Sequence, residues 1–255
     1  GIGEALAKEL VSRKAKIVIA ARSLNKLEKL ADDLKNHGTE ILAVKTDVSD
    51  EKECKALIEN TVEKFGKIDI LINNAGISMR ALFEQVELGV MKQLMDVNFW
   101  GMVYCTKYAL PYLLKQKGSV VGVSSIAGFK GLPGRIGYSS SKFAMHGFIE
   151  VLRTENLKKD LHVLLACPGF TSTNIRKTAL AKDGSQQGET PRDEAGMMSS
   201  EEVAKKIANA IEKKKRTLVL TAQGKLIVFL NKFIPAWVDK QTYNHLAKEP
   251  DSPFN

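Results

Sequence analysis

The sequence has few cysteines, few histidines and no long apolar run, and each absence excludes a class of protein. Its three cysteines, Cys54, Cys105 and Cys167, are widely spaced and form no CxxC pair. This argues against a disulfide framework or a structural zinc site and suits a reducing compartment. The four histidines show no metal-ligand spacing, so we expect no metal. No stretch of about 18 uncharged apolar residues is present, which excludes a membrane span within the sequence, and no secretory signal opens it. We therefore expect a cytoplasmic protein.

Length and composition are those of one globular domain. A chain of 255 residues with 44% hydrophobic content can bury a large core. The formal net charge of +9 could favour nucleic acid, anionic lipid or a phosphorylated cofactor. The lysines are scattered apart from the cluster at residues 213–216, and no interleaved aromatic residues accompany them. Solvated surface charge is therefore favoured, and no nucleic-acid partner is expected.

Strand-like runs alternate with amphipathic helical stretches, which is typical of a parallel sheet covered on both faces. Strands are expected at residues 16–20, 41–45, 69–72, 119–123, 163–166 and 217–220. Helices are expected at residues 2–13, 24–37, 51–65, 89–115, 138–159 and 200–213. Pro111 should bend or break the last part of the long helix. The predicted fold class is α/β, a Rossmann-type doubly wound parallel sheet in a single domain over residues 1–255.

Two segments do not fit this alternation. Residues 170–198 lack clear periodicity and contain several Gly and Pro residues, and a loop of that length in a compact domain is usually a functional lid over a substrate. Residues 224–248 are apolar and basic. They would cover the substrate pocket or an oligomer interface. The alternative is a peripheral contact with a membrane, whose interface suits basic and aromatic residues.

Tyr138 and Lys142 lie four residues apart in an expected helix, downstream of the strand-like run at residues 119–123. Residues with this spacing share a helix face, with Cβ atoms ~5–6 Å apart. A fixed ammonium group there favours the phenolate, and lowering a Tyr pKa from ~10 to near 7 requires roughly 4 kcal/mol. The pair can therefore make a phenol acidic enough for catalysis, although a single pair of this kind proves nothing by itself.

Further segments stand in a definite order around this pair. They are Gly1 and Gly3 before a helix, Asn73, Asn74, Ala75 and Gly76 after a strand, Asn98 within a helix, Ser125 after a strand, and Pro168 and Gly169 before the long loop. Together they closely resemble the classical short-chain dehydrogenase/reductases, and the resemblance covers essentially the whole chain. The long loop and the basic C-terminal segment resemble the hydroxysteroid-dehydrogenase and lipid-reductase branch of that family.

The resemblance implies four catalytic residues. Tyr138 would be the general acid and base for a carbonyl or alcohol oxygen. Ser125 would orient that oxygen, with Ser124 as its rival, because adjacent strand residues face opposite ways. Lys142 would lower the Tyr138 pKa and hold the nicotinamide-ribose hydroxyls. Asn98 would anchor a water that relays protons to Lys142.

The resemblance also implies a nicotinamide dinucleotide that supplies the hydride. Its expected contacts are Gly1, Ile2, Gly3, Arg22, Ser23, Asp47, Val48, Asn74, Ala75, Gly76, Tyr138, Lys142, Pro168, Gly169, Thr171 and Thr173. No acidic residue stands at residues 20–23, where NAD-preferring relatives carry Asp. Arg22 can bind a 2′-phosphate with a forked, charge-assisted bond, and Ser23 can add a hydroxyl. Asp47 resembles the family's adenine-contacting Asp. The predicted cofactor is NADP(H).

The predicted function is interconversion of a ketone and a secondary alcohol on an apolar lipid, steroid or similar skeleton. Five residues would form an apolar pocket: Met79, Phe83, Phe129, Phe170 and Trp237. One alternative is a 3-oxoacyl carrier-protein or CoA reductase, because the basic surface could attract phosphopantetheine-bearing acidic partners. An alternative of another class is a nucleotide-sensing interaction module. The family's habits imply a homodimer or homotetramer.

The sequence opens directly into a helix, with no strand before Gly1. In this place, Gly1 and Gly3 resemble the tail of a glycine-rich loop whose first half is absent. In the family the preceding strand lies in the middle of the sheet, where its loss would unpair two neighbours. We therefore expect the natural protein to extend upstream by roughly 10–20 residues, which would supply the strand and the turn.

Overall fold

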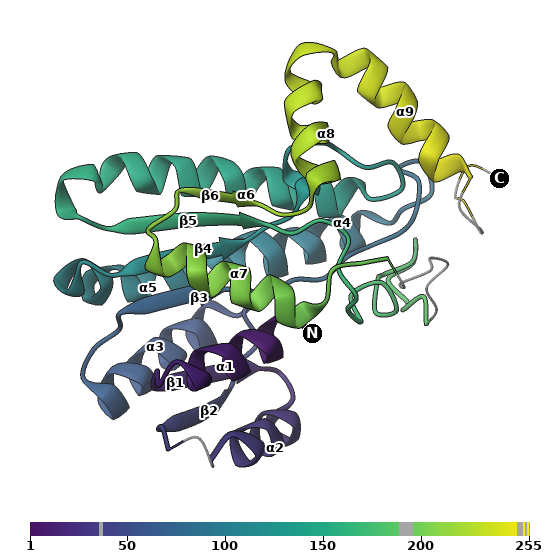
Figure 1. Ribbon diagram of the computed structural model, residues 1–255. Helices are drawn as coiled ribbons and strands as arrows, with labels where there is room; N and C mark the ends of the chain where they lie inside the picture. Colours follow the sequence, from purple (N-terminus) through teal and green to yellow (C-terminus); the bar gives the residue numbers. More distant parts are fainter. Residues whose placement is uncertain (36–37, 189–195, 249–251, 253, 255) are drawn as a thin grey trace.

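A computed structural model describes residues 1–35, 38–188, 196–248, 252 and 254. Its strands are β1 (Ile17–Ala21), β2 (Ile41–Lys45), β3 (Ile70–Asn73), β4 (Ser119–Val123), β5 (His162–Cys167) and β6 (Thr217–Val219). Its α-helices are α1 (Ile2–Ser12), α2 (Leu24–Leu34), α3 (Glu51–Phe65), α4 (Leu88–Met95), α5 (Gly101–Gln116), α6 (Ile136–Glu155), α7 (Ser200–Glu212), α8 (Ala222–Phe233) and α9 (Pro235–Ala247). Figure 1 shows the strands between two layers of helices, and the predicted α/β fold class is confirmed.

Every strand pairing in the described chain is parallel, but the strands form two ladders rather than one. β1 pairs with β2, while β3, β4, β5 and β6 follow one another in a second ladder. The sheet is thus interrupted between β1 and β3, each of which pairs with a single strand among the described residues. The sequence predicts two such unpaired neighbours, and the upstream strand expected between them stays a prediction.

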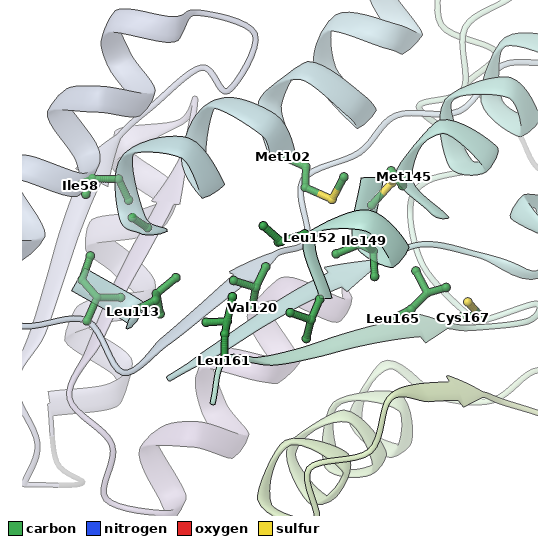
Figure 2. Close-up of a cluster of buried hydrophobic side chains, with 13 residues drawn as sticks. Ile58, Met102, Leu113, Val120, Met145, Ile149, Leu152, Leu161, Leu165 and Cys167 are labelled. Atoms are coloured by element: carbon green, nitrogen blue, oxygen red, sulfur yellow. The ribbon is translucent and has the colours of Figure 1, made fainter. Parts of the chain in front are cut away.

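The core lies on both faces of the longer ladder because side chains alternate along each strand. On β4, Val120 faces a cluster built with α3, α5 and α6, whereas Val121 packs with α1 and α7. Figure 2 shows the first cluster, in which Met145 and Ile149 of α6 lie over the strands. Strands buried on both faces read as continuous apolar runs, which explains the sequences of β4 and β5.

The long helix at residues 89–115 departs from its prediction. It is interrupted at Asp96–Trp100, a π-helical turn between α4 and α5, and not at Pro111. Pro111 lies within α5, where both Pro111 and Lys107 are exposed. On an exposed helix face, water can replace the hydrogen bond that proline cannot donate. The predicted break was wrong for this reason.

Smaller differences occur at three helix ends. α2 ends at Leu34, short of the expected residue 37, which lies outside the described residues. α6 begins at Ile136, before Tyr138, and ends at Glu155. A separate 3₁₀ turn follows at Leu157–Lys159, so the single helix predicted for residues 138–159 is two elements.

The two irregular segments have distinct structures. Within the expected lid, residues 170–188 and 196–198 contain no helix or ladder strand and are joined by isolated bridges such as Thr171 with Met198. The rest of the expected lid, residues 189–195, lies outside the described residues. The apolar C-terminal segment forms α8 and α9, which project beyond one end of the sheet (Figure 1). Among the described residues, no helix is both long and apolar enough to cross a membrane.

The packing of α6 predicts a large effect of one core substitution. Ile149→Ala should lower the free energy of unfolding by about 2–5 kcal/mol, because its side chain is fully buried and the cavity cannot collapse completely. Val151→Ala on the same helix is a matched control, since Val151 is 56% exposed. Urea denaturation measures both, and equal losses in the two variants would contradict this account of the core.

Candidate active site

A cavity of about 1070 Å³ lies where β3, β4, β5 and β6 end. Its floor includes the start of α1, its walls include the first turns of α6, and α8 and α9 cover another side. In parallel α/β sheets, ligands bind outside the carboxyl ends of the strands, and pockets for small molecules span roughly 300–1,000 Å³. The cavity therefore has the position and the size of a ligand-binding site.

Tyr138 lines this cavity from the first turns of α6. Burial raises the pKa of the Tyr138 hydroxyl, while a hydrogen bond with Ser125 and the charge of Arg135 act in the opposite direction. The sequence predicted that Lys142 would lower this pKa, which stays a prediction, and it did not predict the contribution of Arg135. The phenol is thus a proton donor over the neutral pH range.

The two serines after β4 separate as their alternation predicts. Ser125 is the hydrogen-bonding neighbour of Tyr138, and its Oγ also accepts from the amide of Ala127 at 3.1 Å. The Oγ of Ser124 lies 2.8 Å from Nε2 of His146, on α6. Ser125 therefore holds the geometric position expected of the residue that orients a substrate oxygen.

Lys142 is deeply buried between α6 and β4. Its Nζ donates to the carbonyl of Val123 at 3.1 Å and lies 3.5 Å from Sδ of Met145. The ammonium lies over the Tyr138 ring, 5.7 Å from its centroid. Burial lowers the pKa of Lys142 to about 8. With this pKa, Lys142 is still largely protonated at neutral pH, and its effect on the pKa of Tyr138 stays a prediction.

Asn98 lies in the π-helical turn and links three parts of the site, although it does not line the cavity. Its Oδ1 accepts from the amide of Ile77 at 2.8 Å, and its Nδ2 donates to the carbonyl of Ile77 at 3.0 Å. The same Nδ2 donates to Oγ of Ser141 at 2.8 Å. π-helical turns occur frequently at functional sites because they redirect a side chain. Here the turn joins the segment after β3 to α6.

Two glycines lie where the backbone approaches other side chains closely at the cavity wall. A Cβ on Gly3 would lie 2.7 Å from Nδ2 of Asn74, so the end of that side chain would have to move. A Cβ on Gly76 would lie 3.2 Å from Oδ1 of Asn98 and 3.5 Å from Nζ of Lys142. Glycine therefore lets the start of α1 and the turn after β3 meet. The free amides at a helix start suit a pyrophosphate, so these residues fit a dinucleotide.

The expected cofactor contacts fall into two groups. Those that line the cavity are Gly1, Ile2, Gly3, Asn74, Gly76, Tyr138, Lys142, Pro168, Gly169, Thr171 and Thr173. Those that do not line it are Arg22, Ser23, Asp47, Val48 and Ala75. The side chain of Asn73 points away from the cavity, because its Nδ2 donates to Oγ1 of Thr106 at 3.1 Å.

Arg22 follows β1 and Asp47 follows β2, and the two side chains are close enough for their charges to interact. Burial opposes ionisation of Asp47, but hydrogen bonds from the Ser49 hydroxyl and amide and the charge of Arg22 lower the pKa of Asp47 overall. Oδ1 of Asp47 accepts both Ser49 bonds, at 2.7 Å and 3.0 Å. Arg22 itself is exposed at the end of β1, where a ligand could reach it.

The predicted apolar pocket needs correction. Phe170 and Trp237 line the cavity, but Met79 is fully buried in a neighbouring cluster. Phe83 is 61% exposed, and Phe129 packs edge-on against His146 with ring centroids 4.5 Å apart. The apolar lining comes instead from residues after β4, from the long loop and from the C-terminal helices: Ile126, Leu132, Ile175, Met197, Met198, Leu226, Ile227, Leu230, Val238 and Leu246. Residue type alone could not select these positions, because residues far apart in the sequence meet at the cavity only when α8 and α9 pack there.

Three site residues were missed: Arg135, His146 and Arg176. Arg135 and Arg176 line the cavity. Burial and the charge of Lys142 lower the pKa of His146 to about 4, so its ring is neutral when it contacts Ser124. A helical signal was available, since Arg135 precedes Tyr138 by about one turn and His146 follows Lys142 by one turn. In the described part of the chain, no group of three or more His, Cys, Asp or Glu side chains could hold a metal.

Comparison with known proteins agrees with this geometry. The sequence pattern of the family described as short chain dehydrogenase matches residues 1–184. The chain is 38% identical over 177 residues to 11-beta-hydroxysteroid dehydrogenase-like 2 of Arabidopsis thaliana, which covers 69% of this chain and 57% of that protein. It thus spans little more than half the length of that relative. It is 32% identical over 250 residues to dehydrogenase/reductase SDR family protein 7-like of Dictyostelium discoideum, covering 95% of this chain and 78% of that protein.

Solved structures show the same fold. An alcohol dehydrogenase from the archaeon Thermococcus sibiricus, complexed with 5-hydroxy-NADP, superposes with a TM-score of 0.75 at 26% identity, covering 86% of this chain and 91% of that one. A 3-ketoacyl-ACP reductase from Sinorhizobium meliloti 1021 superposes with a TM-score of 0.78 at 26% identity, covering 89% and 96%.

The parallel sheet and the cavity at its strand ends define a Rossmann-type α/β domain with a ligand-binding site. The chain belongs to the short-chain dehydrogenase family, and its curated relatives include proteins named as 11-beta-hydroxysteroid dehydrogenases.

The buried ammonium of Lys142 should lower the free energy of unfolding of the protein at neutral pH. The folded pKa of about 8 lies below the ordinary value of 10.5, so folding is opposed below pH 8 and this penalty fades as pH rises toward 10.5. Replacing Lys142 with Met removes the penalty but leaves the Val123 carbonyl without its donor. Lys142→Met should therefore raise the free energy of unfolding at pH 7 by about 1–2 kcal/mol.

Urea denaturation of the nucleotide-free protein at several pH values measures this effect. The gain should shrink between pH 8 and pH 10.5, and the exposed-site control Lys115→Met should show neither gain nor pH dependence. A loss of stability in Lys142→Met at pH 7 would show that the buried ammonium does not oppose folding.

Proposed function

We propose that this protein is an NADP(H)-dependent oxidoreductase that interconverts a ketone and a secondary alcohol on a largely apolar substrate. The observation that carries the proposal is the meeting of Ser125, Tyr138 and Lys142 in one cavity of about 1070 Å³. The start of α1 forms one side of that cavity, and apolar side chains of α8 and α9 form another. A dinucleotide and an apolar substrate can thus approach the same tyrosine from different sides.

In the reducing direction, Tyr138 holds the proton that the substrate oxygen requires. Its raised pKa keeps it protonated at neutral pH, and Ser125 hydrogen-bonds near its hydroxyl. A carbonyl oxygen within reach of both hydroxyl groups would be polarised and held for proton transfer. The bound dinucleotide would supply the hydride to the carbonyl carbon.

Lys142 and Asn98 would support this chemistry without contacting the substrate oxygen. With a pKa of about 8, Lys142 can release and recover a proton near neutral pH, as a relay to Tyr138 requires. Asn98 holds Ile77 and Ser141, and the Ser141 hydroxyl donates to the carbonyl of Tyr138 at 2.8 Å. Asn98 thereby positions the catalytic turn of α6. The water that it would anchor remains part of the proposal.

Tyr138→Phe tests the catalytic assignment directly. It should lower kcat for NADPH-dependent carbonyl reduction by about 10²–10⁴-fold, because phenylalanine has no proton to donate. The control Tyr112→Phe removes a hydroxyl from α5 outside the cavity and should retain wild-type turnover. The assay is loss of NADPH absorbance over a panel of ketosteroids, aliphatic ketones, quinones and 3-oxoacyl thioesters. Turnover that survives in Tyr138→Phe would remove Tyr138 from the mechanism.

The choice of NADP(H) rests on Arg22 and Ser23. Both are exposed at the end of β1, and the charge of Arg22 already acts on Asp47 nearby. The carboxylate of Asp47 accepts two hydrogen bonds from Ser49. The forked guanidinium of Arg22 matches the geometry of a 2′-phosphate. The archaeal alcohol dehydrogenase of similar fold was solved with an NADP derivative, which supports this choice.

Cofactor selectivity gives the second test. Wild-type kcat/KM should be about 10-fold or more higher with NADPH than with NADH, and Arg22→Asp should reverse the preference by repelling the phosphate. Lys107→Asp, an exposed substitution on α5, controls for the altered net charge. A wild-type preference for NADH, or unchanged selectivity in Arg22→Asp, would overturn the assignment.

A 3-oxoacyl carrier-protein or CoA reductase is the second candidate. It is favoured by the superposition on a 3-ketoacyl-ACP reductase and by the net charge of +9, which suits an acidic carrier. The same substrate panel separates the two functions. A homodimer or homotetramer and a peripheral membrane contact through α8 and α9 also belong to the proposal, supported by exposed apolar residues such as Phe143, Phe229 and Phe233.

A further inference from the structure

Arg135 occupies a fixed position beside the proposed catalytic tyrosine. It is the N-cap residue of α6, and its carbonyl accepts from the amide of Ser139 at 2.8 Å. The preceding carbonyl of Gly134 accepts from the amide of Ala81 at 2.9 Å, so the backbone on both sides of Arg135 is held. It lines the large cavity, and its charge opposes the rise that burial causes in the pKa of Tyr138. Arg135 is therefore a preorganised cation at the reacting end of the cavity.

Two further arginines lie near Arg135. Arg80, Arg135 and Arg176 together line a small hollow of about 10 Å³, and Arg135 and Arg176 also line the large cavity. Nη1 of Arg176 donates to the carbonyl of Thr171 at 3.1 Å, which fixes its guanidinium. Burial, together with the charges of Arg80 and Arg176, lowers the pKa of Arg135. Like charges gathered in a partly desolvated place favour the binding of an anion.

Arg80 and Arg176 have further interactions of their own, so the charge that matters for a ligand is that of Arg135. Among the described residues, no carboxylate forms an ion pair with Arg135. The acidic residue in the described lining of the cavity is Glu4, which is bound to Lys8 at 2.6 Å. Lys130, another cation of the lining, is matched by Asp239 of α9. The charge of Arg135 is thus available to a ligand.

We propose that the substrate is amphipathic and carries an anionic oxygen group, a carboxylate, phosphate or sulfate, that binds Arg135. This inference rests on the proposed function and narrows its substrate class. The apolar skeleton would lie against Leu226, Leu230 and Val238 of the C-terminal helices, and the carbonyl would lie at Tyr138. A planar guanidinium forms two parallel bonds to each of these anions, which would fix the carbonyl relative to Ser125 and Tyr138.

Matched substrates test the proposal. Medium-chain oxo acids, with the ketone at successive positions, are compared with their methyl esters and with phosphate and sulfate esters of the corresponding oxo alcohols. Wild-type kcat/KM should be about 10-fold or more higher for at least one anionic form than for the methyl ester with the same ketone position. The member of the series with the largest ratio identifies the anion and its distance from the carbonyl.

Variants separate Arg135 from general electrostatic attraction. Arg135→Gln should lower the anion-to-ester ratio to near one, and Arg135→Lys should restore part of it because it keeps the charge but loses the fork. Arg216→Gln removes one exposed positive charge outside the cavity lining and should keep the wild-type ratio. Circular dichroism melting establishes that each variant is folded.

Two results would overturn the proposal: a wild-type preference for the esters, or an unchanged anion-to-ester ratio in Arg135→Gln. A change confined to KM for NADPH would also overturn it, because Arg135 would then bind the cofactor. If the wild type reduces neither form, the proposed function fails, and calorimetric binding of dodecanoate and methyl dodecanoate still decides this inference. Equal affinities in the wild type would then exclude an anion site at Arg135.

Discussion

The packing of α6 across β4 and β5 is the constraint on which the rest of the site depends. Met145 and Ile149 are buried on the sheet, and this fixes both the rotation and the axial position of the helix. The first turns of α6 then extend past the strand ends, where Tyr138 and Lys142 reach the cavity. Because protein interiors are close-packed, a shift of this helix would move the tyrosine by a similar amount. The packing of α6 against the sheet therefore also fixes the position of the proposed catalytic residues.

The same packing forces charged groups out of water. Lys142 is held at the end of β4 with a pKa of about 8, and Arg135 caps the helix near two other arginines. His146, one turn beyond Lys142, is neutral with a pKa of about 4. Burial disfavours the charged forms of Lys142 and Arg135, so keeping these charges here opposes folding. Perturbed groups gathered in and around one cavity are typical of functional sites, where protonation must change near neutral pH.

Features of the site that depend on residues close together in the sequence were predicted, whereas those that depend on residues far apart were predicted less well. The helix that bears Tyr138 and Lys142, and the alternation that separates Ser124 from Ser125, depend on local geometry and were predicted from the sequence. The C-terminal segment was expected to cover the substrate pocket or an oligomer interface, and it lines the cavity. Apart from Trp237, the residues of α8 and α9 that do so were not predicted, because these helices contact the site from far along the chain. Pro111 was misjudged for a similar reason, since the effect of a proline depends on whether its helix face meets solvent.

The sequence by itself determined the order of strands and helices, the parallel α/β class and the family, because periodicity and short motifs are written along the chain. Only the tertiary structure decided that Arg135 also acts on Tyr138, that Asn98 joins Ile77 to Ser141, and which apolar residues of the C-terminal helices line the cavity. These outcomes depend on distances and burial between distant segments. Electrostatic interactions and desolvation vary steeply with both, and neither is encoded in local spacing.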